Sequence, residues 1–269
     1  MDQSAATGPR VAIVTGGASG IGRRTAQVLA RDGVGTYLID TDETAGEQTA
    51  RALRARGGTA TFLRGSVSDE AFLDTAVDRV LSEQGRIDYL VNAAGILDGY
   101  ATLEETSPAL LDRVLAVNLL GPVQLCRRVV PHMVSAGYGK VVNVTSWAAS
   151  VGDAGGMSYT VSKHGLLGLT RNLAASYGRH GVRVNAVCPG AIGTGLRAST
   201  ARELAGFELD MSRGLGASGP ERLQSLIPLG FPGSDTDVAE LIAFVCSDRG
   251  DYIHGASLPV DGGFLCRGA

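Results

Sequence analysis

Short β-branched runs alternate with longer amphipathic segments along most of the chain. Two of these runs, within 140–145 and 183–188, are apolar at odd and even positions alike, which is typical of parallel strands buried on both faces. Segments of helical length between successive strands predict right-handed crossovers, and therefore a doubly wound α/β fold with a parallel sheet. Strands are expected at Val11–Thr15, Thr36–Asp40, Ala60–Arg64, Ile87–Asn92, Lys140–Thr145, Arg183–Cys188 and Ser257–Val260, and helices at 20–32, 42–56, 69–84, 107–135 and 157–180.

The alternation breaks at residues 195–233, a stretch punctuated by glycines that stands where a sixth crossover would be. Insertions above the carboxyl ends of parallel strands usually line or cover the ligand crevice. We therefore expect a substrate lid with one or two short helices, and an ordinary surface excursion is the alternative. The rest of 10–269 shows no linker or repeat and is expected to form one domain, preceded by a disordered arm at 1–9.

The chain has 269 residues, of which 44% are hydrophobic and 19% are charged, a composition typical of a globular protein. Its formal net charge of −3 argues against a dedicated binder of nucleic acid or anionic membranes. The N-terminus lacks the features of a signal peptide, and no run of 18 uncharged apolar residues occurs, so we expect a cytoplasmic protein without a membrane span.

The four cysteines are scattered and form no Cys-x-x-Cys pair, which favours reduced thiols over a disulfide framework or a zinc site. The four histidines also lack the spacing of metal ligands, so no metal is expected.

Three glycines, Gly16, Gly20 and Gly22, follow the first strand with the spacing G-x-x-x-G-x-G and lead into a helix. Small residues there let the backbone approach a pyrophosphate, which binds at the positive N-terminal end of the helix. With 38 glycines in the chain, this spacing alone arises by chance about 0.7 times. The position between the first strand and the first helix is what makes the motif informative.

An aspartate, Asp40, ends the second strand. A carboxylate there can accept hydrogen bonds from the adenosine ribose hydroxyls, and it repels the 2′-phosphate of NADP. No basic residue occupies the glycine-rich loop, which also favours NAD. The alternative is that Asp40 caps the next helix, although Asp42 is available for that purpose.

Small residues also end the fourth and sixth strands, in Asn92–Gly95 and in Pro189–Thr194. They leave room for a flat cofactor ring. Thr194 is placed to contact a nicotinamide amide or a phosphate.

Tyr159 and Lys163 stand at i and i+4, and therefore on one face of the helix expected at 157–180. A phenol, with a reference pKa of about 10, is a poor base at neutral pH. A neighbouring ammonium favours the phenolate, so we expect Lys163 to lower the pKa of Tyr159 and make it an acid/base group. An exposed surface pair is the alternative. Ser146 could bind the substrate oxygen, and the adjacent Trp147 could wall the pocket or pack in the core.

Taken in order, these motifs closely resemble the short-chain dehydrogenase/reductase family from residue 10 to residue 264. The matching segments are TGGASGIG at 15–22, Asp40, NAAG at 92–95, VNLLG at 117–121, VTS at 144–146, YTVSK at 159–163, NAVCPG at 185–190 and PVDGG at 259–263. The resemblance implies a Rossmann fold and a catalytic tetrad of Asn118, Ser146, Tyr159 and Lys163.

The family pattern also implies a role for each member of the tetrad. Asn118 would interrupt its helix and hold a proton-relay water near Lys163, which would also donate to the cofactor ribose. Ser146 would orient the reacting oxygen and Tyr159 would carry the proton, while hydride passes between the carbinol carbon and C4 of the nicotinamide. A homotetramer, packed through the helices at 107–135 and 157–180 and through regions near the C-terminus, is implied as well.

The chain departs from the family pattern in two places. Ser66-Val67 stands where an Asp-Val pair usually meets the adenine, and the lid at 195–233 matches no member that would identify the substrate.

The favoured hypothesis is an NAD-dependent oxidoreductase that interconverts a secondary alcohol and a ketone. An NADPH-dependent 3-oxoacyl-type reductase and a non-catalytic dinucleotide-binding regulator are the alternatives. The expected cofactor contacts are Gly16, Ser19, Gly20, Ile21, Gly22, Asp40, Ser66, Val67, Asn92, Ala93, Gly95, Tyr159, Lys163, Pro189, Gly190, Ile192 and Thr194.

Overall fold

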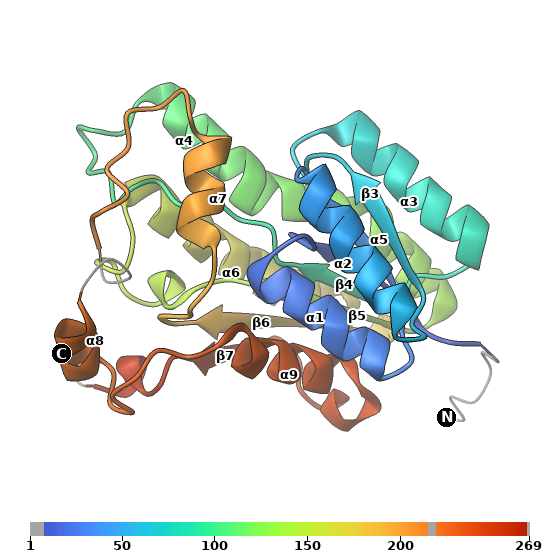
Figure 1. Ribbon diagram of the computed structural model, residues 1–269. Coiled ribbons are helices and arrows are strands. Elements are labelled where there is room, and N and C mark those ends of the chain that lie inside the picture. Colours follow the sequence, from blue (N-terminus) through green and yellow to red (C-terminus); the bar gives the residue numbers. More distant parts are fainter. Residues whose placement is uncertain (1–7, 215–218, 268–269) are drawn as a thin grey trace.

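The computed structural model describes residues 8–214 and 219–267 as a sheet between two layers of helices (Figure 1). Its seven parallel strands run in the order β3-β2-β1-β4-β5-β6-β7, which confirms the doubly wound α/β fold. The strands are β1 (Val11–Thr15), β2 (Gly35–Asp40), β3 (Ala60–Arg64), β4 (Tyr89–Asn92), β5 (Gly139–Val144), β6 (Val182–Pro189) and β7 (Ser257–Val260). Residues 1–7 of the arm expected at the N-terminus lie outside the described residues.

Consecutive residues of each central strand point into opposite cores because side chains alternate across a sheet. Ile13 belongs to the core covered by one layer of helices, and its neighbour Val14 to the core covered by the other. The first layer comprises α3 (Glu70–Gln84), α4 (Pro108–Leu115), α5 (Gly121–Ala136) and α6 (Met157–Tyr177), and the second α1 (Gly20–Arg31), α2 (Glu43–Ala55) and α9 (Asp235–Cys246).

The helix expected at 107–135 is divided by a π-helical turn, η1 (Ala116–Leu120), with Asn118 at its centre. The combined run Pro108–Ala136 is long and apolar enough to cross a membrane by length and composition alone. In this fold 44% of its most apolar window is buried, and α5 packs against α3 and the sheet. Core helices have the same composition, so the packing accounts for the apolar run.

The stretch expected as a lid contains two short helices, α7 (Leu196–Glu203) and α8 (Pro220–Leu226). A single bridge between Ile192 and Gly233 closes its base, and residues 215–218 lie outside the described part. The sixth crossover is nevertheless completed by α9, which the alternation of patterns did not predict. A capping box of Ser234 and Asp237 starts this helix.

Lys140, one of the two lysines of the chain, lies at the end of the sheet opposite the carboxyl ends of the strands. Its side chain is 2% exposed and its ammonium forms an ion pair with Asp251 and donates to the Ser247 carbonyl. These contacts fix the start of β5 to the segment after α9. The sequence alone offered no role for this residue.

Candidate active site

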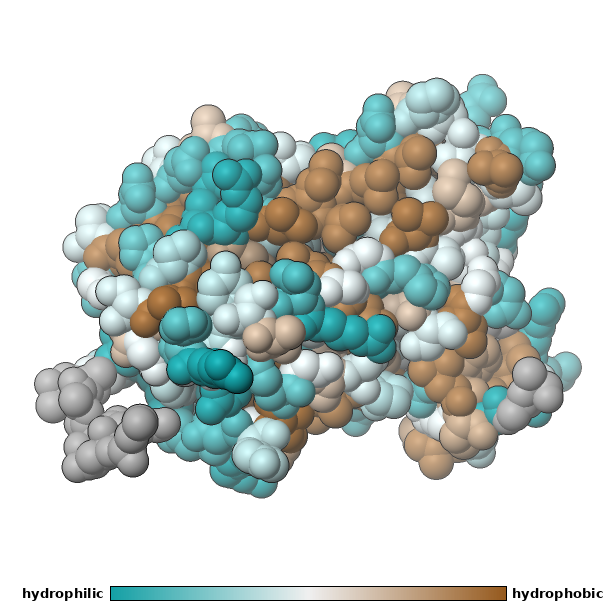
Figure 2. All heavy atoms as spheres, turned by 180° about the vertical axis from the view of Figure 1, so that it is seen from behind, coloured by the Kyte–Doolittle hydropathy of each residue, from teal (hydrophilic) through white to brown (hydrophobic). Residues whose placement is uncertain are grey.

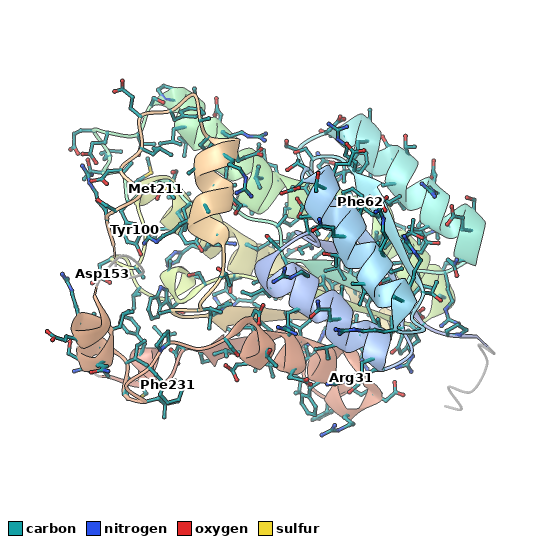
Figure 3. The ribbon with its side chains drawn as sticks, viewed as in Figure 1. Arg31, Phe62, Tyr100, Asp153, Met211 and Phe231 are labelled. Carbon is teal, nitrogen blue, oxygen red and sulfur yellow. The ribbon has the colours of Figure 1, made fainter. Side chains whose placement is uncertain are left out.

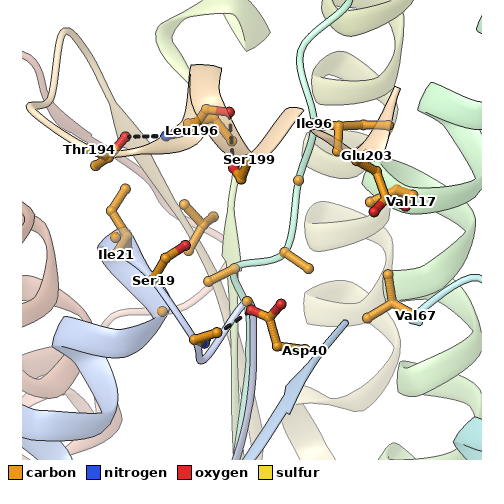
Figure 4. A pocket seen from close by; sticks show the side chains of 18 of the residues that line it. Ser19, Ile21, Asp40, Val67, Ile96, Val117, Thr194, Leu196, Ser199 and Glu203 are labelled. Atoms are coloured by element: carbon orange, nitrogen blue, oxygen red, sulfur yellow. Dashed lines mark hydrogen bonds between the residues drawn. The ribbon is translucent and has the colours of Figure 1, made fainter. Parts of the chain in front are cut away.

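A cleft of about 520 Å³ opens at the carboxyl ends of the strands, between the sheet and α7 (Figure 4). This is the usual ligand site of a doubly wound sheet, and the volume lies within the range of small-molecule pockets. Every sequence-predicted cofactor residue lines the cleft except Asn92. The lining residues that sequence reasoning missed include Thr41, Asp42, Ala94, Ile96, Val117, Thr145, Leu196, Ser199, Arg202 and Glu203.

The glycine-rich loop approaches its neighbours too closely for side chains. A Cβ at Gly22 would lie 2.3 Å from the Gly16 carbonyl oxygen. Gly16 has a positive φ, and a Cβ there would lie 3.1 Å from the Ala93–Ala94 backbone. Ser19, the N-cap residue of α1, makes no side-chain capping bond, and the first turn of α1 contains no acidic residue. This end of the cleft therefore offers an anion the free N–H groups of a helix N-terminus without carboxylates that would repel it.

Asp40 faces the same end of the cleft from the end of β2. Its carboxylate accepts hydrogen bonds from the backbone N–H groups of Ala18, at 3.0 Å, and Asp42, at 3.1 Å. Burial raises the pKa of Asp40 above its usual value, while these hydrogen bonds act in the opposite direction. Asp42, not Asp40, caps α2 by accepting from the Ala45 N–H. The helix-cap alternative for Asp40 is therefore wrong.

A cation that sequence reasoning missed lies near the carboxylate of Asp42. Arg202 of α7 lines the cleft and its guanidinium lies 3.7 Å from the carboxylate of Asp42. Ser66 and Val67 also line this part of the cleft, and the Ser66 hydroxyl lies 2.8 Å from that of Ser68. The group of residues fits the adenosine half of a dinucleotide, with a carboxylate and hydroxyls for its ribose and ring.

Asn92 departs from its expected place. Its side chain is buried and does not line the cleft, and its amide nitrogen donates to Asn143 Oδ1 at 2.8 Å. The strand ends at Asn92, and it is the small residues after it, Ala93 and Gly95, that line the cleft.

Ser146, Tyr159 and Lys163 line the other end of the cleft. Lys163 Nζ lies 5.6 Å from the centre of the Tyr159 ring and donates to the Val144 carbonyl at 3.0 Å. All three side chains are more than 90% buried, so the surface-pair alternative for Tyr159 and Lys163 is wrong. The three residues line the cleft although little of their surface is exposed.

The pKa of Tyr159 moves in the direction opposite to the expectation. Burial raises it to about 12, although hydrogen bonding with Ser146 works to lower it. Burial also lowers the pKa of Lys163 to about 8. Desolvation disfavours the charged form of each group, and it is the largest cause of both shifts.

Asn118 does not line the cleft but lies directly behind it, fully buried. Its Oδ1 accepts from the Ile96 N–H at 2.8 Å, and its Nδ2 donates to the Ile96 carbonyl at 2.9 Å and to Ser162 Oγ at 3.1 Å. A Cβ at Gly95 would lie 3.4 Å from Asn118 Oδ1 and 3.5 Å from Lys163 Nζ. Asn118 and Lys163 therefore both lie next to Gly95, and the amide of Asn118 is already engaged by protein groups.

An apolar wall adjoins the catalytic side chains. Trp147 is 5% exposed, and its ring centre lies 4.2 Å from that of Phe264 near the C-terminus. Trp147, Ala154 and Tyr159 pack in one cluster, with Leu97, Val151, Ala191, Phe264 and Leu265 partly buried around it. Trp147 therefore packs as a core residue in a cluster whose outer members remain accessible.

The described residues include no group of three or more His, Cys, Asp or Glu side chains that could hold a metal ion. The four cysteines are free; three are buried and Cys266 is exposed.

Comparison with known proteins places the chain among oxidoreductases. Residues 16–265 match the family model described as enoyl-(acyl carrier protein) reductase. The chain is 40% identical over 256 residues to cis-4-hydroxycyclohexanecarboxylate dehydrogenase of Sinomonas cyclohexanicum, covering 95% of this chain and 96% of that protein. It is 36% identical over 258 residues to D-threitol dehydrogenase of Mycolicibacterium smegmatis, covering 96% and 94%. The crystal structure of levodione reductase matches with a TM-score of 0.86 at 33% identity, covering 96% of this chain and 98% of that one.

Proposed function

The chain belongs to the short-chain dehydrogenase/reductase family of oxidoreductases, and within it we propose an NAD-dependent enzyme that interconverts a secondary alcohol and a ketone. One observation carries this proposal. A single cleft holds a carboxylate suited to a ribose at one end and the Ser146, Tyr159 and Lys163 side chains at the other. A dinucleotide spans such a cleft, with its reactive ring at the catalytic end.

The residues of the cleft fit the cofactor part by part. The glycine-rich loop and the start of α1 would hold the pyrophosphate, and Asp40 would accept hydrogen bonds from the adenosine ribose. Lys163 would donate to the other ribose, and Ala93, Gly95 and Gly190 leave room for the nicotinamide, which supplies the hydride chemistry when bound.

In the proposed mechanism Tyr159 transfers the proton at the carbinol oxygen, and Ser146 holds that oxygen. The pKa of the isolated Tyr159 site lies too high for a base at neutral pH, so positive charge must favour its phenolate during turnover. Lys163 provides one such charge whenever its ammonium is protonated, and its pKa of about 8 leaves it mostly protonated at neutral pH. The buried, apolar surroundings strengthen this interaction and exclude water from the reacting atoms.

The substrate is proposed to be a small or medium hydroxyl compound with an apolar carbon skeleton. The partly exposed Leu97, Val151 and Phe264 of the apolar wall lie beside Tyr159 and would contact the carbons that flank the carbinol. The names of the relatives, two of which specify a hydroxycyclohexanecarboxylate and a tetritol, support alcohols and ketones as the substrate class.

A second candidate, an NADPH-dependent reductase of the same fold, is favoured by Arg202 alone. Its guanidinium lies on the adenosine side of the cleft, where a cation could meet a 2′-phosphate. Two features favour NAD over this candidate. Asp40 directs a carboxylate to the same region, and Arg202 lies beside the carboxylate of Asp42.

We further propose a homotetramer that works in the cytoplasm. Figure 2, seen from the side on which α5 and α6 lie, shows apolar side chains gathered in a band across this face. Leu120, at the end of η1, and Val161 of α6 are 52% and 48% exposed. Exposed apolar surface of this kind marks interfaces, and the free cysteines suit a reducing compartment.

The test is a screen of secondary alcohols and ketones, cyclic and linear, for a change in nicotinamide absorbance with NAD(H) and NADP(H) in parallel. Turnover with NAD(H) supports the proposal, and turnover confined to NADP(H) selects the second candidate. A protein that binds NADH but turns over no substrate in the screen would instead be a dinucleotide-binding regulator.

A further inference from the structure

The first turn of α6, which carries Tyr159, is capped by a side chain from a distant loop. The N-cap residue, Gly156, has no side chain that could bond to the free N–H groups of this turn. Asp98, 61 positions before Tyr159, provides the capping side chain instead. One carboxylate oxygen of Asp98 accepts from the Tyr159 N–H at 2.8 Å and from the Ser158 hydroxyl at 3.0 Å. Tyr159 is the third residue of the helix, where an N-cap side chain normally bonds.

The other oxygen of Asp98 is also doubly engaged. It accepts from the Gly156 N–H at 3.2 Å and from the Tyr100 N–H at 3.1 Å. The side chain of Asp98 is 1% exposed, and a buried carboxylate is stable only when donors or positive charge compensate for lost hydration. Four donors and the positive end of the α6 dipole provide that compensation here. Two donors on each oxygen also fix the orientation of the carboxylate.

The Asp98 carboxylate lies too close to Gly156 for any side chain at that position. A Cβ at position 156 would lie 2.4 Å from one carboxylate oxygen and 2.5 Å from the other. The backbone of Gly156, with φ −73° and ψ 178°, is one that any residue adopts. Position 156 therefore requires glycine because the Asp98 carboxylate lies so close to it, and not because of the backbone conformation there.

The loop that carries Asp98 also contacts other parts of the site. Its residue Ile96 holds the amide of Asn118 with both backbone groups, and the Leu97 N–H donates to Thr200 of α7. Figure 3 shows Tyr100, from the same loop, beside the lid segment that carries Met211. One short stretch of backbone therefore joins the lid, Asn118 and the first turn of α6.

We propose that Asp98 is a positioning residue that fixes Tyr159 for proton transfer through the backbone of the first turn of α6. The inference rests on the proposed function, because it assigns the proton to Tyr159. Lys163 lies one turn further along α6, so a shift of the first turn moves the phenol relative to the ammonium and Ser146. A misplacement of about 1 Å can lower a rate about 100-fold.

The first test is Asp98→Asn. Asparagine retains one acceptor oxygen, so two of the four donors then face an amide group and the first turn loses its fixed position. We expect kcat to fall about 100-fold with NADH affinity unchanged. The charge of Asp98 contributes to the high pKa of Tyr159, so the limb of the kcat profile that reports Tyr159 should move to lower pH. Asp69→Asn, which alters the exposed cap of α3 away from the catalytic end, is the matched control and should leave kcat unchanged.

The second test measures unfolding free energies and needs no activity. Gly156→Ala should destabilise the chain strongly, and much less when Asp98→Ala has removed the carboxylate that the new methyl group meets. If the effects of Gly156→Ala and Asp98→Ala on the unfolding free energy were additive, the close contact between position 156 and the Asp98 carboxylate would be absent, which would overturn the inference. So would Asp98→Asn with wild-type kcat and pH profile. If the unmutated protein turns over no alcohol or ketone, the proposed function fails, and this cycle still reports the contact independently.

Discussion

Asp40→Asn removes a single charge from the end of the cleft where we propose that the adenosine ribose binds, the part in which NAD and NADP differ. Unit charges 4 Å apart interact by about 4 kcal/mol at an effective dielectric constant of 20, and exposure to the open cleft halves this to about 2 kcal/mol. Removing the repulsion should therefore strengthen NADPH binding about 30-fold. NADH should bind more weakly, because a ribose hydroxyl bonded to a neutral amide contributes about 1 kcal/mol less than one bonded to a carboxylate. Together the two changes shift selectivity about 100-fold towards NADPH.

The measurement is the dissociation constant of each reduced cofactor, by fluorescence titration of the unmutated and altered proteins. Asp69→Asn is the matched control because it removes the same charge from a helix cap that does not line the cleft, and asparagine still caps α3. Selectivity should change much more for Asp40→Asn than for Asp69→Asn. Equal changes, or an NADPH-to-NADH ratio within threefold of its original value, would refute this expectation.

Two further predictions concern Lys163. Lys163→Arg should lose most activity, measured as kcat with NADH affinity in parallel, because a planar guanidinium cannot replace a compact ammonium in this buried site; wild-type kcat would contradict this. Between about pH 8 and pH 10 the unfolding free energy of the cofactor-free protein should rise relative to that of Lys163→Met, since the unfolded chain binds more protons at Lys163 than the folded one does. Denaturant titrations of the two proteins at each pH measure this difference, in which the opposing contributions of the buried Cys126 and Cys246 cancel.

The strands and most helices follow from local pattern alone. Buried parallel strands are marked by continuous apolar runs, and β1, β3 and β7 have the bounds that their sequences predict. The run at 107–135 shows where pattern fails. Its periodicity indicates one helix, whereas the π turn at Asn118, whose side chain accepts from the distant Ile96 N–H, was indicated only by the family resemblance. α9 was missed because the glycine-rich excursion before it obscured the sixth crossover.

Sequence motifs located the residues at both ends of the cleft but not the residues of α7 that line it. Gly22 and Lys163 could be assigned because their residue types have strong chemical requirements at fixed spacing. Leu196, Ser199 and Glu203 line the cleft at helical spacing along α7, yet a short polar helix carries no signal that tells which face meets the cofactor. Asp98 could not be identified from the sequence because the helix turn that it caps, at Tyr159, lies 61 residues away in the chain.

The expected effect of Lys163 on Tyr159 shows the limit of reasoning from spacing. An i, i+4 pair places the two side chains together, but the pKa depends on how deeply both are buried. Burial of Tyr159 raises its pKa to about 12. Depth of burial is set by the tertiary packing around Trp147 and Phe264, which sequence spacing does not report.

Tyr159→Phe deletes only the hydroxyl that would carry the proton, and it therefore separates proton transfer by this side chain from every other property of the cleft. The ring keeps its packing against Trp147 and Ala154, so the fold and NADH binding should be retained. General acid–base catalysis contributes about 10²–10⁴-fold, and we expect kcat with the best alcohol or ketone to fall by about that factor at unchanged NADH affinity. Turnover within tenfold of the unmutated protein would contradict the account and remove Tyr159 from the mechanism.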